Sequence, residues 1–128
     1  MTSLRGVVTS GLGQGAHFVS LPWVRDVIRR MTGIEAYPGT LNIRLVDPSM
    51  LSAWRRIRQA PGLRVAPPAP EQCGARLIPV VVAPDVAAAV IVPDVTRHGD
   101  EMLELVAGVH VRSLLGLRDD DPVTLQIP

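Results

Sequence analysis

Short stretches rich in apolar and β-branched residues recur along the chain, separated by clusters of glycine, proline and aspartate. This pattern is typical of β-strands joined by turns. The predicted strands cover residues 4–9, 17–20, 40–45, 76–82, 86–92, 102–107 and 123–127. We expect the first two to form a hairpin around a glycine-rich tip. The runs 76–82 and 86–92, separated by Ala-Pro-Asp, are typical of a buried hairpin.

Helical spacing of apolar residues begins at Pro22, and Gly33 can end that helix. The residues that share its apolar face are Val24, Val27, Ile28 and Met31. Asp47-Pro48 opens a second predicted helix, and residues 109–117 contain a third, which Gly116 can end.

The connector 60–70 contains many prolines, whose fixed backbone angles disfavour both helix and central strand, so we expect a loop there. About six strands, two or three short helices and no regular alternation of strand and helix favour a mainly β fold, a small and mostly antiparallel barrel. At 128 residues we expect residues 1–128 to form a single domain.

Composition narrows this picture in two ways. Aromatic residues make up 3% of the chain, so the core must come from aliphatic side chains. The net charge is +1 and the basic residues are scattered arginines, with no lysine, which gives no electrostatic footprint for nucleic acid. Arginine nevertheless binds phosphate well, so phosphorylated small molecules remain possible ligands.

The single cysteine, Cys73, excludes an internal disulfide and fits a reducing compartment. The first residues lack the apolar core of a signal peptide, and no run approaches the roughly 18 apolar residues of a membrane span. We therefore expect a cytoplasmic protein without a membrane partner. The spacing of the histidines relative to Cys73 does not favour zinc.

Thr40 and Asn42 project from the same face of the predicted strand 40–45, beside the turn Tyr37-Pro38-Gly39. Their neutral oxygens suit a hard cation or a phosphate oxygen, although a wet strand face would have the same pattern. The glycines within residues 11–15 can expose successive backbone N–H groups to an anion, or can form only a flexible hairpin tip.

Glu104 is an acid within an apolar run, so it must lie at the barrel rim, be paired, contact a ligand, or face solvent from an amphipathic strand. Thr96 precedes that run. Arg112 and the N–H groups at the start of the last predicted helix can bind an anion. The alternative is that Arg112 is a solvated arginine on a surface helix.

Taken in order, these features resemble the archaeal-type CTP-dependent riboflavin kinases over nearly the whole chain. The resemblance rests on a Gly-x-Gly-x-Gly segment, an amphipathic helix, Pro-Gly-Thr-Leu-Asn, Thr-x-His before an apolar run with Glu, and Arg-x-Leu-Leu-Gly-Leu before an acidic turn. It implies a six-stranded cradle-loop barrel that transfers the γ-phosphoryl group of CTP to the 5′-hydroxyl of riboflavin, giving FMN and CDP.

By position, the resemblance also implies roles for individual residues. Thr40 and Asn42 would hold Mg²⁺, and Thr96 and Glu104 would contact the flavin, with Glu104 as the candidate catalytic residue. The nucleotide would be held by Gly11, Leu12, Gly13, Gln14, Gly15, Ala16, Val109, His110, Val111 and Arg112.

The sequence departs from that family at Gln14, where an acid is expected, in the connector 60–70 and at Cys73-Gly74-Ala75. These departures concern substrate choice and rate more than fold. A non-catalytic barrel that binds a flavin or a cytidine nucleotide, and a structural barrel without a small ligand, stay open as alternatives. The oligomeric state is also open.

Overall fold

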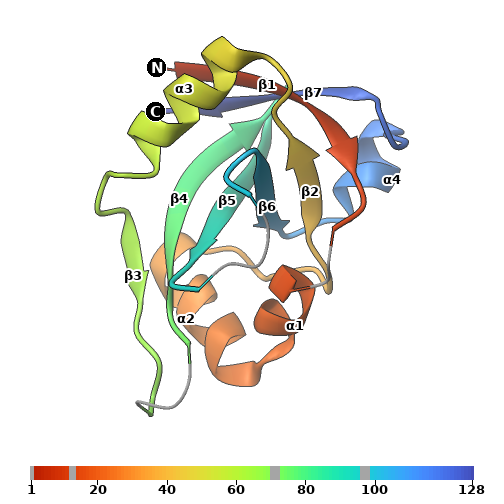
Figure 1. The fold of residues 1–128 in the computed structure, drawn as a ribbon. Coiled ribbons are helices and arrows are strands. Elements are labelled where there is room, and N and C mark those ends of the chain that lie inside the picture. The colour runs from red at the N-terminus through yellow and green to blue at the C-terminus, as the bar shows by residue number, and fades with distance from the viewer. Residues whose placement is uncertain (1, 12–13, 70–72, 96–98) are drawn as a thin grey trace.

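The computed structural model describes residues 2–11, 14–69, 73–95 and 99–128 (Figure 1). Six antiparallel strands close into a barrel in the order β4-β5-β6-β2-β1-β7, and β7 pairs with β4 to complete the ring. A further strand, β3, lies outside the ring on the edge of β4. This confirms the predicted barrel of six strands.

The elements follow one another with short connections. The strands are β1 (Thr2–Thr9), β2 (Leu41–Arg44), β3 (Leu63–Val65), β4 (Ala75–Val82), β5 (Val86–Pro93), β6 (Met102–Ala107) and β7 (Pro122–Ile127). The helices are α1 (Gln14–Ser20), α2 (Pro22–Thr32), α3 (Pro48–Ile57) and α4 (Val111–Leu115). In Figure 1 α1 and α2 lie at one end of the barrel, while α3 lies near the two chain termini at the other.

Alternation along the strands sends side chains to two different cores. On β6, Leu103 and Leu105 belong to the cluster that fills the barrel, whereas Val106 belongs to a second cluster under α1 and α2. The neighbouring strand β5 divides in the same way, with Val90 inside and Ile91 outside. One outer face of the barrel is therefore covered by helices, and polar side chains on that face can be buried without entering the barrel.

Helix ends match the signals in the sequence. Pro22 opens α2, and Gly33 ends it in the left-handed conformation at φ 76°. The carboxylate of Asp47 accepts a hydrogen bond of 2.8 Å from the backbone N–H of Ser49 at the start of α3. Hydrogen bonds from Ser49 lower the pKa of Asp47. The stabilisation that this cap provides is present above the unfolded-state pKa and is lost as the pH falls through the lowered value.

Three expectations are corrected. Residues 17–20 are part of α1 and not a strand, because Val19 packs beneath the helices and the ring of Phe18 lies edge-on to Trp23, with centroids 5.9 Å apart. The connector 60–70 contains β3, which pairs with the edge of β4 between prolines. Four short helices, in place of two or three, are present within the described residues.

Within the residues that the structure describes, none of the helices has the length and apolar character needed to cross a bilayer.

Candidate active site

A row of polar side chains crosses the helix-covered outer face of the barrel. Cross-strand register places Thr9 of β1 opposite Asn42 of β2, and Asn42 opposite Glu104 of β6. All three follow the alternation that sends their neighbours Val8, Ile43 and Leu105 inward. The predicted metal ligand Asn42 and the predicted flavin contact Glu104 are therefore cross-strand neighbours.

Glu104 is the one buried charged residue of the described chain, with 3% of its surface exposed. Its Oε2 accepts a hydrogen bond of 2.9 Å from Thr40 Oγ1 and another of 3.1 Å from the backbone N–H of Gly15. The sequence left a solvent-facing position open for Glu104, and the structure instead buries and pairs it. One carboxylate thus joins the predicted nucleotide segment to the predicted metal ligand Thr40.

Asn42 has a polar atom that finds no partner among the described residues. Its Oδ1 is buried and accepts no hydrogen bond from any residue that the structure describes. Gly11 packs so closely on this carboxamide that a Cβ at position 11 would collide with it. Buried polar atoms are rarely left unpaired, and an orphaned oxygen near a carboxylate suits a hard cation.

No group of three or more His, Cys, Asp or Glu side chains gathers as a metal site within the described ranges. A cation beside Asn42 would therefore depend on neutral oxygens, on Glu104 and on oxygens brought by a ligand. Mg²⁺ characteristically binds in this way, through few protein groups together with substrate phosphates and water. The residues present thus fit the cation that the resemblance implies.

The backbone of Gly15 packs directly against the carboxylate of Glu104. A Cβ at position 15 would overlap Glu104 Oε2. We expect Gly15→Ala to lower the free energy of unfolding by about 1–3 kcal/mol, the usual cost of overpacking a filled site. Thermal or urea unfolding measures this change. Activity should fall as well, because the carboxylate must move away from Thr40.

A double-mutant cycle provides the control for that contact. In a Glu104→Ala background the space that the new Cβ needs is already vacant, so Gly15→Ala should cost much less. An equal cost in both backgrounds would show that the substitution acts elsewhere, for example on α1 itself.

A pocket of about 120 Å³ lies between the turn 37–40 and residues 109–112. Thr40 lines it, and so do the four predicted nucleotide contacts of the second segment, Val109, His110, Val111 and Arg112. The rings of Tyr37 and His110 lie in contact at its wall, with centroids 5.3 Å apart. The structure therefore brings the second predicted nucleotide segment next to Thr40.

A second, apolar pocket of about 440 Å³ was not predicted from the sequence. It is lined by His17, Phe18, Leu21, Trp23, Cys73, Gly74, Pro93 and Val95. One signal was available: the chain has one Phe, one Tyr and two Trp, and three of these four aromatic residues line the two pockets. Because the pocket combines three separate segments of the chain, residues 17–23, 73–74 and 93–95, spacing alone could not assemble it.

An ion pair lies beside the apolar pocket. Arg64 of β3 makes two hydrogen bonds, of 2.5 and 2.8 Å, to Asp94, which stands between the pocket residues Pro93 and Val95. This guanidinium lowers the pKa of Asp94. The pair ties the outer strand to the end of β5, next to the pocket.

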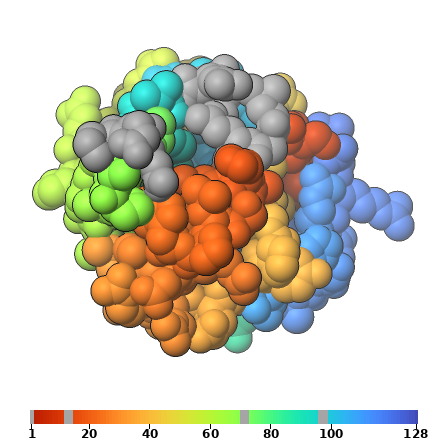
Figure 2. Space-filling model, turned by 90° about the horizontal axis from the view of Figure 1, so that it is seen from below, coloured from red at the N-terminus to blue at the C-terminus, as the bar shows by residue number. Residues whose placement is uncertain are grey.

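Figure 2 views the helix-covered end of the molecule directly. The orange α1 and α2 cover it, and the gold segment near residue 40 lies between α1 and the blue C-terminal part. Of the predicted nucleotide segment, Gly11 contacts Asn42, Gly15 bonds Glu104, and Gln14 and Ala16 belong to α1. Leu12, Gly13 and the predicted flavin contact Thr96 lie outside the described residues.

Comparison with known proteins found similarity over nearly the whole chain. The family model CTP-dep_RFKase, described as "Domain of unknown function DUF120", matches residues 8–127. The chain is 36% identical over 133 residues to a protein of Thermofilum pendens and 40% identical over 129 residues to one of Pyrobaculum calidifontis, both named "Riboflavin kinase". A third protein of that name, from Saccharolobus solfataricus, is 33% identical over 129 residues.

These matches cover 98%, 97% and 97% of this chain, respectively. They cover 59% of the Thermofilum and Pyrobaculum proteins and 73% of the Saccharolobus protein, so the chain spans about three fifths of the first two relatives. The family model alone covers far more than half of the chain. The chain belongs to the CTP-dependent riboflavin kinase family.

Proposed function

We propose that this protein is a riboflavin kinase that uses CTP as phosphoryl donor. The observation that carries the proposal is the buried carboxylate of Glu104, which bonds both the nucleotide segment at Gly15 and the cation ligand Thr40. Phosphoryl transfer depends mainly on positioning and on neutralising phosphate charge, and needs no nucleophilic side chain. A buried carboxylate that joins the nucleotide segment to a metal ligand therefore suits phosphoryl transfer.

On the donor side, the pocket formed by 37–40 and 109–112 holds the nucleotide, and Arg112 supplies a guanidinium for its phosphates. Thr40 and Asn42 hold Mg²⁺, with Asn42 Oδ1 gaining the partner that it lacks among the described residues. Bound there, Mg²⁺ would neutralise phosphate charge. The contact of Gly11 with Asn42 places the start of the glycine segment at the same point.

On the acceptor side, the apolar pocket has the lining that a planar heteroaromatic ring requires. Phe18 and Trp23 offer aromatic surface, and Trp23 Nε1 is a buried donor without a partner among the residues described. Helix α1 joins this pocket to Glu104, because Gly15 bonds the carboxylate and Phe18 lines the pocket. A flavin ring held there has its ribityl chain directed to Glu104, which orients the attacking 5′-hydroxyl.

Trp23→Leu tests the acceptor site. Leucine keeps the pocket apolar but removes the aromatic face, so we expect KM for riboflavin to rise by about tenfold, the size of one lost stacking contact. The KM for CTP should stay unchanged and is the internal control. A riboflavin KM equal to that of the wild type would place the ring elsewhere.

Purified protein incubated with riboflavin, Mg²⁺ and each of the four nucleoside triphosphates tests the proposal as a whole. We expect FMN to form with CTP and much less with ATP, GTP or UTP. Thermal stabilisation by riboflavin and CTP without FMN formation would instead support a binding protein of the sensor or carrier type. If neither compound changed the melting temperature, a structural barrel would be favoured.

A further inference from the structure

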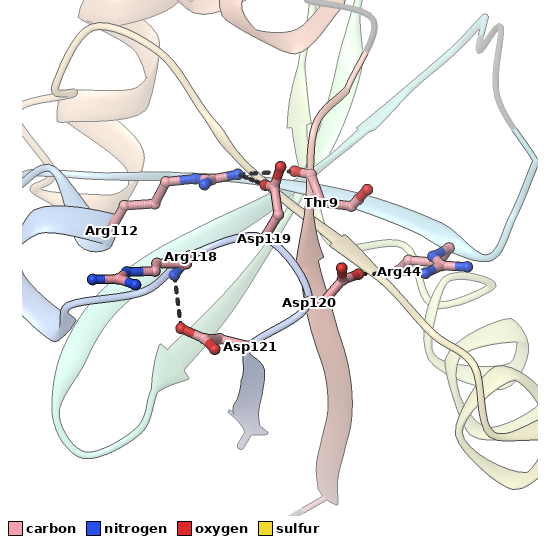
Figure 3. Close-up of polar contacts among 7 residues, drawn as sticks. All are labelled: Thr9, Arg44, Arg112, Arg118, Asp119, Asp120 and Asp121. Carbon is pink, nitrogen blue, oxygen red and sulfur yellow. Dashed lines mark hydrogen bonds and ion pairs between the residues drawn. The ribbon is translucent and has the colours of Figure 1, made fainter.

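Asp119 is not one of the predicted site residues, but it contacts one of them, Arg112. Its Oδ1 accepts a hydrogen bond of 2.7 Å from Arg112 Nη2, and the same nitrogen donates to the backbone carbonyl of Thr9 at 3.3 Å (Figure 3). Arg112 lines the pocket that we assign to the nucleotide. Thr9 is the β1 residue opposite Asn42. The guanidinium is therefore fixed where the nucleotide pocket meets the end of β1.

The backbone holds Asp119 in place. Residues 118–121, here called the acidic turn, are tied to β1 by hydrogen bonds from Asp120 N to Val8 O and from Val8 N to Asp121 O, of 2.8 and 2.9 Å. The carboxylate of Asp121 caps the turn by accepting from Arg118 N at 2.8 Å. Figure 3 shows the three aspartates pointing to different partners, and only Asp119 reaches Arg112. A rigid turn thus presents one carboxylate to one guanidinium.

The ion pair between Arg112 and Asp119 contributes too little to folding stability for that to be its role. The side chains of Arg112 and Asp119 are 33% and 58% exposed, and ion pairs this exposed contribute little to folding. A free arginine side chain, however, samples many rotamers and must be ordered when it binds an anion. A neighbouring carboxylate that fixes the guanidinium beforehand removes this cost from ligand binding.

Arg112 keeps donors available in this arrangement. Both of its hydrogen bonds use Nη2, while Nε and Nη1 donate to none of the residues in the described ranges. A guanidinium can bind a carboxylate through one part and a phosphate through another, because its donors are fixed in a planar fork. Asp119 therefore orients Arg112 without occupying all of it.

We propose that Asp119 is a positioning residue that sets Arg112 to receive the phosphates of the donor nucleotide. The inference rests on the proposed function, because it takes the pocket at 109–112 as the nucleotide site. Asp119 touches neither substrate, and it acts only through Arg112. The opposite effect, a carboxylate that repels the triphosphate, would make removal of Asp119 strengthen binding.

The test compares Asp119→Ala with Asp119→Glu and Asp120→Asn. We expect Asp119→Ala to raise KM for CTP by roughly tenfold, the effect of losing a hydrogen bond to a charged group, with KM for riboflavin and the melting temperature unchanged. Asp119→Glu restores the carboxylate and should recover most of the loss. Asp120→Asn removes the same charge from the same turn, and asparagine tolerates the positive φ of 71° at that position. It should behave as the wild type.

A double-mutant cycle with Arg112→Ala separates positioning from a general effect of charge. Isothermal titration with CTP and Mg²⁺, without riboflavin, measures affinity independently of turnover. In the Arg112→Ala background, Asp119→Ala should cause no further loss. An equal loss in both backgrounds, wild-type affinity in Asp119→Ala, or tighter binding would each overturn the inference while leaving the proposed function intact. Absence of CTP binding by the wild type would overturn both.

Discussion

Asn42→Ala is expected to lower kcat by about 10- to 100-fold, the scale found when groups that support a metal site are removed. The fold should survive the change. Because Asn42 Oδ1 makes no hydrogen bond within the described part of the chain, its removal forfeits no such bond, and the side chain lies on the outer face of the barrel. Steady-state kinetics over a range of Mg²⁺ concentrations, with thermal unfolding in parallel, measures both effects.

Arg44→Ala is the matched control for Asn42→Ala. Arg44 lies two residues further along β2, on the same face, and its only ion pair among the described residues is a long one of 3.9 Å to Asp120. Wild-type turnover is expected there at every Mg²⁺ concentration. If Asn42→Ala also turned over like the wild type at low Mg²⁺, Asn42 would have no part in holding the cation.

Glu104→Gln is expected to reduce kcat by about a hundredfold or more, as for the loss of a group that orients or deprotonates an attacking hydroxyl. Glutamine has nearly the same volume and retains an oxygen that can accept from Thr40 Oγ1 and Gly15 N, so these two hydrogen bonds can persist. What is lost is the negative charge. Single-turnover rates with both substrates saturating isolate this effect on the chemical step.

Glu35→Gln removes the same charge from an exposed position and should leave the rate unchanged. Comparison of the two variants separates the local role of Glu104 from the loss of one unit of protein charge. A Glu104→Gln rate within about twofold of the wild type would show that the carboxylate only holds α1 and Thr40 in place, since general acid–base catalysis typically contributes far more than that.

The sequence was sufficient for the parts of the site that depend on local pattern. Alternation along 40–45 correctly predicted the strand that carries Asn42, and the proline and glycine signals correctly predicted α2. Strand alternation needs only neighbouring residues, and a barrel follows from the number and length of such strands.

The environment of Glu104 could not be predicted from local pattern. Whether that carboxylate was exposed or buried depended on its register opposite Asn42 and on the position of α1, both set by contacts between residues far apart in sequence. The error at 17–20 has a different origin, because four residues are too few for periodicity to distinguish a helix from a strand. The apolar pocket also joins distant segments. The pair of Arg112 with Asp119 is close in sequence, but its geometry depends on hydrogen bonds from residues 118–121 to β1, so both became visible only in the fold.

The most direct test of the central claim follows the phosphorus atom itself. The protein is incubated with riboflavin, Mg²⁺ and CTP labelled at the γ-phosphate, and the products are separated. If the site performs the proposed transfer, the label appears in FMN in a one-to-one ratio with the CDP formed. Label that appears only as inorganic phosphate, or stays in CTP while the protein is folded, would contradict the assignment of Glu104, Thr40 and Asn42 to a riboflavin kinase site.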